Sequence, residues 1–151
     1  VHQPADAAID AGSMYVYSWA STLTAFATKK VVISTAGAEC DINIVVSGGN
    51  NSSLSIKEAI TIDIAGTGAT AYNRYRGQGD SPAFSVEADG TYSAGTTIFT
   101  GFHPDALVGN HQQADGMMRF RLDANTDYQF DLLNLQNATV YAAIIINIHE
   151  L

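Results

Sequence analysis

The chain has 151 residues, a net charge of −8 at pH 7, and 46% apolar against only 15% charged residues. This length fits one domain that buries roughly two-thirds of its unfolded surface, so folding requires no metal or disulfide. Seven basic residues against fifteen acidic ones exclude a general nucleic-acid-binding surface and attraction to an anionic membrane. The longest apolar run, 140–146, has seven residues and is too short to span a bilayer.

Residues 1–12 are rich in Ala and Asp and have no apolar period. This pattern predicts an extended N-terminal arm that only a partner can order, followed by a single domain at 13–151. Asp6 and Asp10 of the arm are candidate contacts for basic groups of that partner. The arm also lacks the basic and apolar regions of a secretory signal, so nothing visible in it directs export.

Beyond the arm, short runs with apolar and polar residues in alternation are separated by Gly, Asn and Asp, a pattern typical of an all-β sandwich or barrel. No run has the apolar spacing of a helix. The last run is apolar on both faces, so we expect it to be central in a sheet or covered by another subunit. The predicted strands are Tyr15–Ala20, Lys30–Thr35, Asp41–Ser47, Ala59–Ala65, Ala83–Glu87, Thr96–Thr100, Met117–Leu122, Tyr128–Asn134 and Thr139–Ile148.

The apolar positions of these runs predict the core, and the longer segments between them predict the binding loops. Segments 66–82 and 101–116 are long and irregular, and binding residues of β domains are most common on such loops. Tyr15, Tyr17 and Trp19 share one face of their strand and are expected to pack inside. The predicted core residues are Val16, Ile33, Ile44, Ile62, Phe120, Phe130 and Ile145.

The strongest candidate binding site is the cluster Tyr72, Asn73, Arg74, Tyr75 and Arg76, which holds two of the seven basic residues. Arginine and tyrosine side chains commonly anchor protein interfaces, and together they can also stack on bases or sugars. The alternative is that each arginine forms an ion pair with one of the chain's own fifteen acids. We predict that the cluster contacts a protein partner.

Other motifs are weaker, and they predict neither a cofactor nor catalysis. Gly66 to Ala71 fits G-x-G-x-x-A, but no helical pattern follows to receive a pyrophosphate. His103 and His111, with nearby aspartates, match no compact zinc spacing, and a solvated loop is expected. The lone Cys40 lies between Glu39 and Asp41, which disfavour its thiolate. No nucleophile or pair of carboxylates has a recognisable catalytic spacing, so the chain is not expected to be an enzyme or to bind a small molecule.

Three segments from Glu58 to the C-terminus resemble the capsid decoration proteins of tailed phages, also called cement or auxiliary head proteins. In that family a Leu-ended strand is followed by a basic Lys-Pro turn, Asn-Thr and a Tyr, whereas Asp123-Ala124 stands at the turn here. The family's last strand tends to end in an aromatic pair before the acid, where this chain has Ile148-His149. The segments are Glu58, a strand and Gly66-Thr67 leading to Tyr72–Arg76; Phe120–Tyr128; and Ile148–Glu150.

The resemblance implies an antiparallel β-sandwich of jelly-roll type that forms homotrimers. It further implies attachment to the major capsid protein on the outside of a virion, after synthesis in the host cytoplasm, where the trimer clamps neighbouring subunits. One alternative is a carbohydrate- or receptor-binding β-sandwich module. Another is a jelly-roll capsid subunit, although the chain has no basic arm for packaging nucleic acid.

Overall fold

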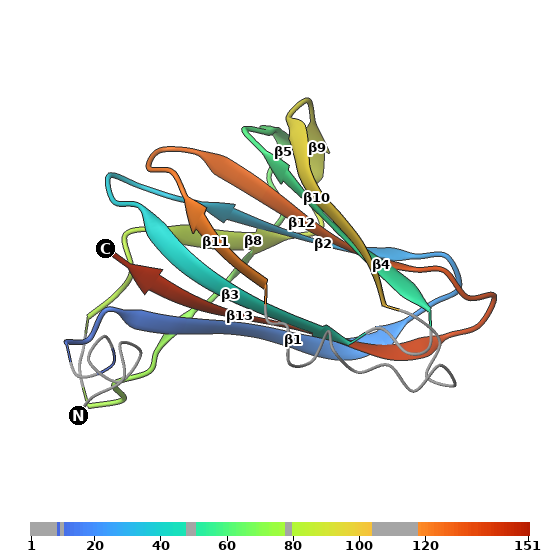
Figure 1. Ribbon diagram of the computed structural model, residues 1–151, viewed down its shortest axis with the longest axis horizontal. Coiled ribbons are helices and arrows are strands. Elements are labelled where there is room, and N and C mark those ends of the chain that lie inside the picture. Colours follow the sequence, from blue (N-terminus) through green and yellow to red (C-terminus); the bar gives the residue numbers. More distant parts are fainter. Residues whose placement is uncertain (1–8, 10, 48–50, 78–79, 104–117) are drawn as a thin grey trace.

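The computed structural model describes residues 9, 11–47, 51–77, 80–103 and 118–151, with the side chains of 102 and 103 excepted. The domain is an all-β, antiparallel structure, and residues 11–47, 51–77, 80–103 and 118–151 contain no helix (Figure 1). The strands are β1 Met14–Leu23, β2 Thr28–Ser34, β3 Cys40–Ser47, β4 Ser52–Glu58, β5 Thr61–Ile64, β6 Thr67–Ala69, β7 Tyr72–Asn73, β8 Ser85–Ala88, β9 Thr91–Ser93, β10 Thr96–His103, β11 Met118–Leu122, β12 Asp127–Asn134 and β13 Val140–Glu150.

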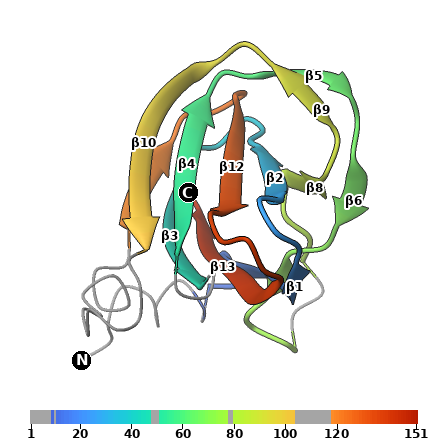
Figure 2. The same ribbon diagram turned by 90° about the vertical axis from the view of Figure 1, so that its right-hand side faces the viewer.

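Two sheets face each other, and their strand order is that of a jelly roll. Sheet A has the order β11-β3-β13-β1-β7, and sheet B has the order β10-β4-β12-β2-β8-β6. Without the short strands β5 to β9, each sheet keeps four strands, and the chain crosses between the sheets as in two Greek keys. Figure 2 shows this arrangement along the strands. The expected jelly-roll-like β-sandwich is therefore confirmed.

The core lies between the sheets because each long strand turns its alternate apolar side chains inward. From sheet A, Tyr15, Tyr17 and every second residue of β13 pack against the apolar residues of β2, β4 and β12; those of β13 are Ala142, Ile144, Ile146 and Ile148. As predicted from its apolar character, β13 is central, between β3 and β1. Of the predicted core residues, Ile33, Ile44 and Phe130 are almost completely buried.

Four core predictions are wrong or only partly right. Val16 alternates with the buried Tyr15 and Tyr17, so it points to the opposite face of β1 and is half-buried. Ile145 alternates with Ile144 and Ile146 and is 39% exposed on the same outer face. Two others are half-buried: Phe120 packs against the edge of the core with its ring 5.9 Å from that of Phe99, and Ile62 lies outside the sandwich in β5.

The largest difference from the predicted strands lies between residues 52 and 93. The predicted strand 59–65 is shorter than expected and starts later, because Ala59 adopts a left-handed backbone (φ 57°) after β4 ends at Glu58. Only Thr61–Ile64 forms a strand beyond it, and Ile64 is 66% exposed rather than part of a buried face. The segment expected to be a long loop at 66–82 contains β6 and β7.

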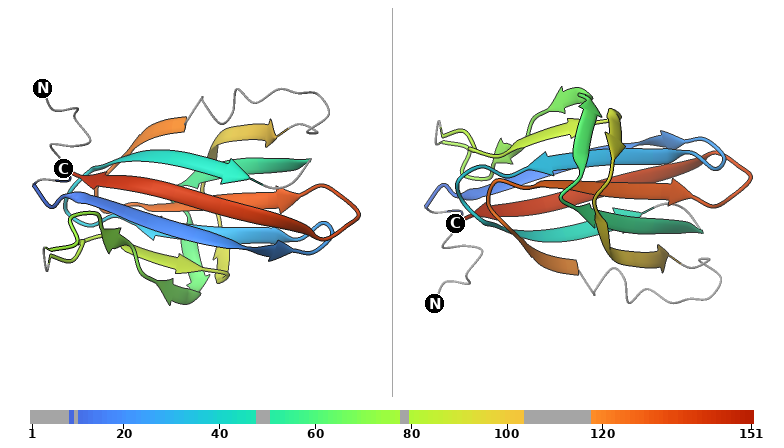
Figure 3. Two further views of the ribbon diagram at one scale, coloured as in Figure 1. Left: turned by 90° about the horizontal axis from the view of Figure 1, so that it is seen from below. Right: turned by 90° about the horizontal axis from the view of Figure 1, so that it is seen from above.

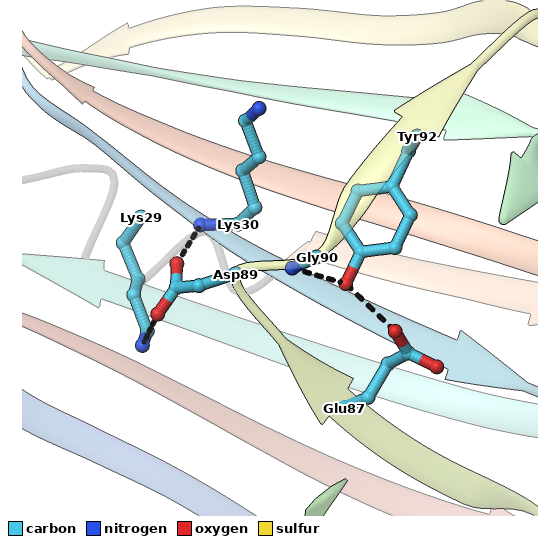
Figure 4. Close-up of polar contacts among 6 residues, drawn as sticks. All are labelled: Lys29, Lys30, Glu87, Asp89, Gly90 and Tyr92. Carbon is cyan, nitrogen blue, oxygen red and sulfur yellow. Dashed lines mark hydrogen bonds and ion pairs between the residues drawn. The ribbon is translucent and has the colours of Figure 1, made fainter. Parts of the chain in front are cut away.

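The segment from β5 to β9 is an insertion between two jelly-roll strands, and hydrogen bonds attach it to β2. Asp89 adopts a left-handed backbone (φ 61°) and accepts hydrogen bonds from the Lys29 Nζ at 2.5 Å and the Lys30 N–H at 3.3 Å. Beside it, the Gly90 N–H donates to the Tyr92 hydroxyl, which donates to Glu87 at 3.0 Å (Figure 4). These contacts fix the insertion on the sandwich.

Candidate functional site

The outer faces of the two sheets differ in how they are covered. The two-stranded sheet of β5 and β9 crosses over β12 and β2 of sheet B (Figures 1 and 3). Consequently Val32 and Gln129, which alternate with core residues and point outward, are 0% and 5% exposed. Over sheet A, no described strand covers the outer face, where Tyr141 is 81% exposed. The uncovered face of sheet A (Figure 3, left) is therefore the surface open to a partner.

Cross-strand pairing arranges the polar residues of this face in two rows. Residues directly opposite one another in neighbouring strands place their side chains on the same face, about 5 Å apart. In both rows the polar residues come from β11, β3 and β13, and β1 contributes an apolar residue. The first row is Arg121, Asp41, His149 and Met14, and the second is Arg119, Asn43, Asn147 and Val16.

The insertion adds β7 to the edge of the same sheet. Tyr72 lies opposite Val16, and the Arg74 N–H donates to the Met14 carbonyl at 2.8 Å. The Asn73 side chain is 6% exposed and holds the turn, because its Nδ2 donates to the Gly12 carbonyl and its Oδ1 accepts from the Tyr75 N–H. Asn73 therefore positions the cluster and is not available to a partner, unlike its neighbours.

The chain's four arginines all lie on this surface. Arg74 donates to the Asn147 Oδ1 at 3.2 Å, and Arg119 donates through Nε to the Asn43 Oδ1 at 2.9 Å. Arg76 lies over the ring of Tyr72 at 5.3 Å. We name as the arginine face the residues Met14, Asp41, Asn43, Tyr72, Arg74, Arg76, Arg119, Arg121, Asn147 and His149.

The predicted cluster is mostly exposed, and its arginines contact neutral groups. Tyr72 is 56% and Tyr75 41% exposed. Arg76 donates to the Asn73 carbonyl at 3.4 Å in addition to its contact with Tyr72. Among the described residues, neither Arg74 nor Arg76 forms an ion pair with a carboxylate. The alternative of an intramolecular ion pair therefore does not hold within that part of the chain.

A shallow cleft of about 420 Å³ lies in the arginine face. It includes most of the two rows and therefore presents guanidinium, amide and imidazole groups to solvent. Sequence reasoning missed these residues, although the polar positions of three predicted strands alternate with buried Ile and Leu and could have indicated them. The cleft is lined by Met14, Asp41, Ile42, Asn43, Arg119, Phe120, Arg121, Asn147 and His149.

Asp41 is the one acidic residue of the cleft, and Arg121 neutralises it. The Arg121 Nε and Nη2 donate to the two carboxylate oxygens of Asp41 at 2.7 and 3.0 Å. This bidentate hydrogen bonding lowers the pKa of Asp41, against the opposing effect of burial, and raises the pKa of Arg121. Asp41 therefore stays ionised and bound to Arg121, which leaves the cleft with a positive charge from the remaining arginine, Arg119.

Several sequence predictions lie outside the described residues. Asp6 and Asp10 lie in the N-terminal segment, and His111 lies in the segment 104–117. The structure describes none of these three residues, nor the side chain of His103. In the described ranges, no group of three or more His, Cys, Asp or Glu side chains could hold a metal. Those ranges also include no helix of the length and apolar character needed to cross a membrane. The segment after Gly66 continues as β6, so no helix begins in the G-x-G-x-x-A motif.

The fold defines an all-β sandwich of the jelly-roll class. No protein-family model matches the chain, and no curated protein matches its sequence. Similar solved structures include the Yersinia pseudotuberculosis-derived mitogen, with TM-score 0.43, 9% identity and coverage of 87% of this chain and 83% of that one. Another is Aeromonas hydrophila PliG, a periplasmic inhibitor of g-type lysozyme, with TM-score 0.41, 12% identity and coverage of 91% and 87%. At these TM-scores the similarities carry no argument about function.

Proposed function

We propose that this protein is a structural protein that decorates the outside of a tailed-phage capsid and clamps neighbouring subunits of the major capsid protein. The observation that carries the proposal is the concentration of all four arginines on the uncovered face of sheet A. The other basic residues, Lys29, Lys30 and Lys57, lie in sheet B. In a chain of net charge −8, one cationic face bearing exposed tyrosines suits a fixed docking orientation on a protein partner.

The chemistry of the face supports binding rather than catalysis. Asp41 is held ionised by Arg121 and so is poorly suited to act as a general acid or base. The only thiol, Cys40, is completely buried, and burial first of all raises its pKa to about 12. A neutral, inaccessible thiol is not a nucleophile. Arginine and asparagine side chains that donate hydrogen bonds, without a general base beside them, are typical of recognition surfaces.

The proposal includes a homotrimer, as the resemblance to decoration proteins implies. The end of sheet A away from the arginines carries two large apolar side chains that no described strand covers, Tyr141 at 81% and Ile145 at 39% exposed, beside the polar Ser18 and Thr22. Apolar side chains on a free face favour burial by a neighbouring subunit. Three copies on a capsid lattice would also bind by multivalency, since three weak contacts act at a high effective concentration.

The test is occupancy on undecorated phage heads. Replacing Arg74 and Arg76 together by Ala is expected to weaken attachment by about 1–4 kcal/mol, because anchors at interfaces contribute that much. A chain without residues 1–10, which keeps the Gly12 carbonyl that holds Asn73, is expected to bind more weakly as well, since the proposal retains Asp6 and Asp10 as contacts. Lys57→Ala, a cationic change on sheet B, is the matched control and should leave occupancy unchanged.

A carbohydrate- or receptor-binding module is the second candidate, and the cleft is the observation that favours it. Its amide, imidazole and guanidinium groups beside the exposed Tyr72 suit an acidic sugar. Failure of the intact chain to bind any phage head, together with retention on an immobilised glycan panel, would replace the capsid proposal with this one.

A further inference from the structure

The central residues of the second row, Asn43 and Asn147, have a fixed amide orientation. Each Oδ1 accepts a hydrogen bond from a guanidinium, that of Arg119 for Asn43 and that of Arg74 for Asn147. A guanidinium has donors and no acceptor, so the oxygen of each amide must be the atom facing its arginine. The Nδ2 groups consequently point away from the arginines, and the two asparagines are direct cross-strand neighbours.

The row therefore presents donors and hardly any acceptors. Within the described part of the chain, neither Nδ2 donates a hydrogen bond, and the Nη groups of Arg119 likewise have no acceptor. The carboxylate that lines the cleft, Asp41, has both oxygens occupied by Arg121. The cleft is thus complementary to a compact anionic acceptor, and a carboxylate matches planar guanidinium and amide donors.

We propose that Arg119, Asn43 and Asn147 of the second row, together with Arg74, bind an aspartate or glutamate side chain in an acidic segment of the partner protein. This inference rests on the capsid-docking function proposed above and names the partner chemistry of the same face. A nucleic acid is a worse match, because a run of phosphates would meet the net charge of −8 and the neighbouring Glu39 and Asp41. One or two carboxylates require only the local donors.

Asn43→Asp and Asn147→Asp are the sharpest tests. Each change is nearly isosteric and gives the neighbouring arginine a carboxylate partner, so folding is expected to persist. The new charge would repel a carboxylate ligand and should lower the affinity for undecorated heads by at least about tenfold for each variant. Asn137→Asp makes the same chemical change at an exposed turn and should keep affinity within about twofold. An equal loss in all three variants would show a net-charge effect and overturn the proposal, as would unchanged binding of the first two.

A second measurement separates this inference from the proposed function. Amide nuclear magnetic resonance of the isolated chain at low salt, titrated with a hexaglutamate peptide, should shift the side-chain resonances of Asn43 and Asn147. Hexathymidylate is the phosphate probe and should shift them less; a larger response to it would overturn the choice of carboxylate. If the intact chain binds no phage head, the capsid function fails. In that case, a shift with hexaglutamate that is lost in Asn147→Asp would still support the carboxylate site. If the hexaglutamate shift is also absent, the carboxylate site fails together with the capsid function.

Discussion

The hydroxyl of Tyr128 links Glu58, at the end of β4, to the turn that precedes β12. It donates to the Glu58 Oε1 at 3.1 Å and accepts from the Asp123 N–H at 2.8 Å, and the ring is 1% exposed. Tyr128 and Glu58 are also direct cross-strand partners in the β12–β4 pairing. The contact thus connects two of the segments on which the resemblance to decoration proteins rests.

Tyr128→Phe is expected to lower the free energy of unfolding by about 1–3 kcal/mol, because it leaves a partly buried N–H of the turn without an acceptor. Urea denaturation measures the difference. Tyr141→Phe removes a hydroxyl from a side chain that is 81% exposed and should change stability very little. Equal effects of the two variants would show that the buried hydrogen bonds of Tyr128 contribute nothing specific.

The alternation of apolar and polar residues correctly predicted the strands that have an apolar inner face and polar turns on either side, such as β3 and β12. It missed β4, because Ser52, Ser53 and Ser55 surround only two core residues and follow a Gly-Asn segment that resembles a long turn. Continuous apolar runs also hid the orientation of side chains. Ile144, Ile145 and Ile146 are chemically alike, so only the pleat of β13 decides that Ile145 faces outward.

The candidate site was predicted in part. Local composition identified Tyr72–Arg76, but the other half of the arginine face comes from β3, β11 and β13, which are distant in sequence. Pairing of these strands brings Arg119 next to Asn43 and Asn147, and a single sequence gives no register between strands. The sequence also predicted Asn73 as a contact with the partner. Its buried position depends on a hydrogen bond to the Gly12 carbonyl, 61 residues away, which local composition does not reveal.

Cys40 is expected to make stability fall above pH 9. Burial, then Glu150 and Asp41, raise the pKa of its thiol from 9.0 to about 12. The contribution of the protonated Cys40 thiol to the free energy of unfolding is complete below the unfolded-state pKa and is lost as the pH rises toward 12. It is lost because the thiol of the unfolded chain ionises in this range while that of the folded chain retains its proton. The slope approaches about 1.4 kcal/mol per pH unit for one proton.

Denaturation between pH 9 and 10 includes the effect of this thiol together with that of Tyr15, Tyr17, Tyr92 and Tyr128, whose pKa values are also raised from an ordinary value of 10.0. Cys40→Ala should have a shallower slope in this interval, and the difference between the two slopes isolates the thiol, whatever the variant's own loss of stability. The native thiol should also resist a thiol reagent at pH 8 until denaturant is added. Rapid labelling of the folded chain would contradict the burial of Cys40.

Glu87 is expected to control the attachment of the insertion that carries Tyr72 and Arg74. Its Oε2 accepts hydrogen bonds from the Gly66 N–H at 2.5 Å and the Tyr92 hydroxyl at 3.0 Å. Glu87→Ala should cost about 1–3 kcal/mol by leaving both donors unpaired, and should speed hydrogen exchange in residues 61–93 more than in β12 and β13.

Glu87→Gln is the matched control, because its amide oxygen can accept from the same two donors. We expect exchange in residues 61–93 to stay close to that of the unmodified protein. If Gln is as disruptive as Ala, the charge of Glu87 rather than its hydrogen bonds holds the insertion. If neither variant changes exchange, Asp89 and its two lysine contacts are sufficient.

The apolar end of sheet A is expected to be buried in a homotrimer. Ile145 and Tyr141 project from β13 on its outer face, where no described residue covers them. Sedimentation at micromolar concentration should give three times the chain mass, and a monomer would remove the trimer from the proposal. Ile145→Asp places a charge at the expected contact and should weaken association by about 10-fold or more, equivalent to about 1.4 kcal/mol. Ile64→Asp is the control, since Ile64 is 66% exposed in β5, in the two-stranded sheet that lies over sheet B. A trimer that resists Ile145→Asp but dissociates with Ile64→Asp would place the subunit contact on the insertion.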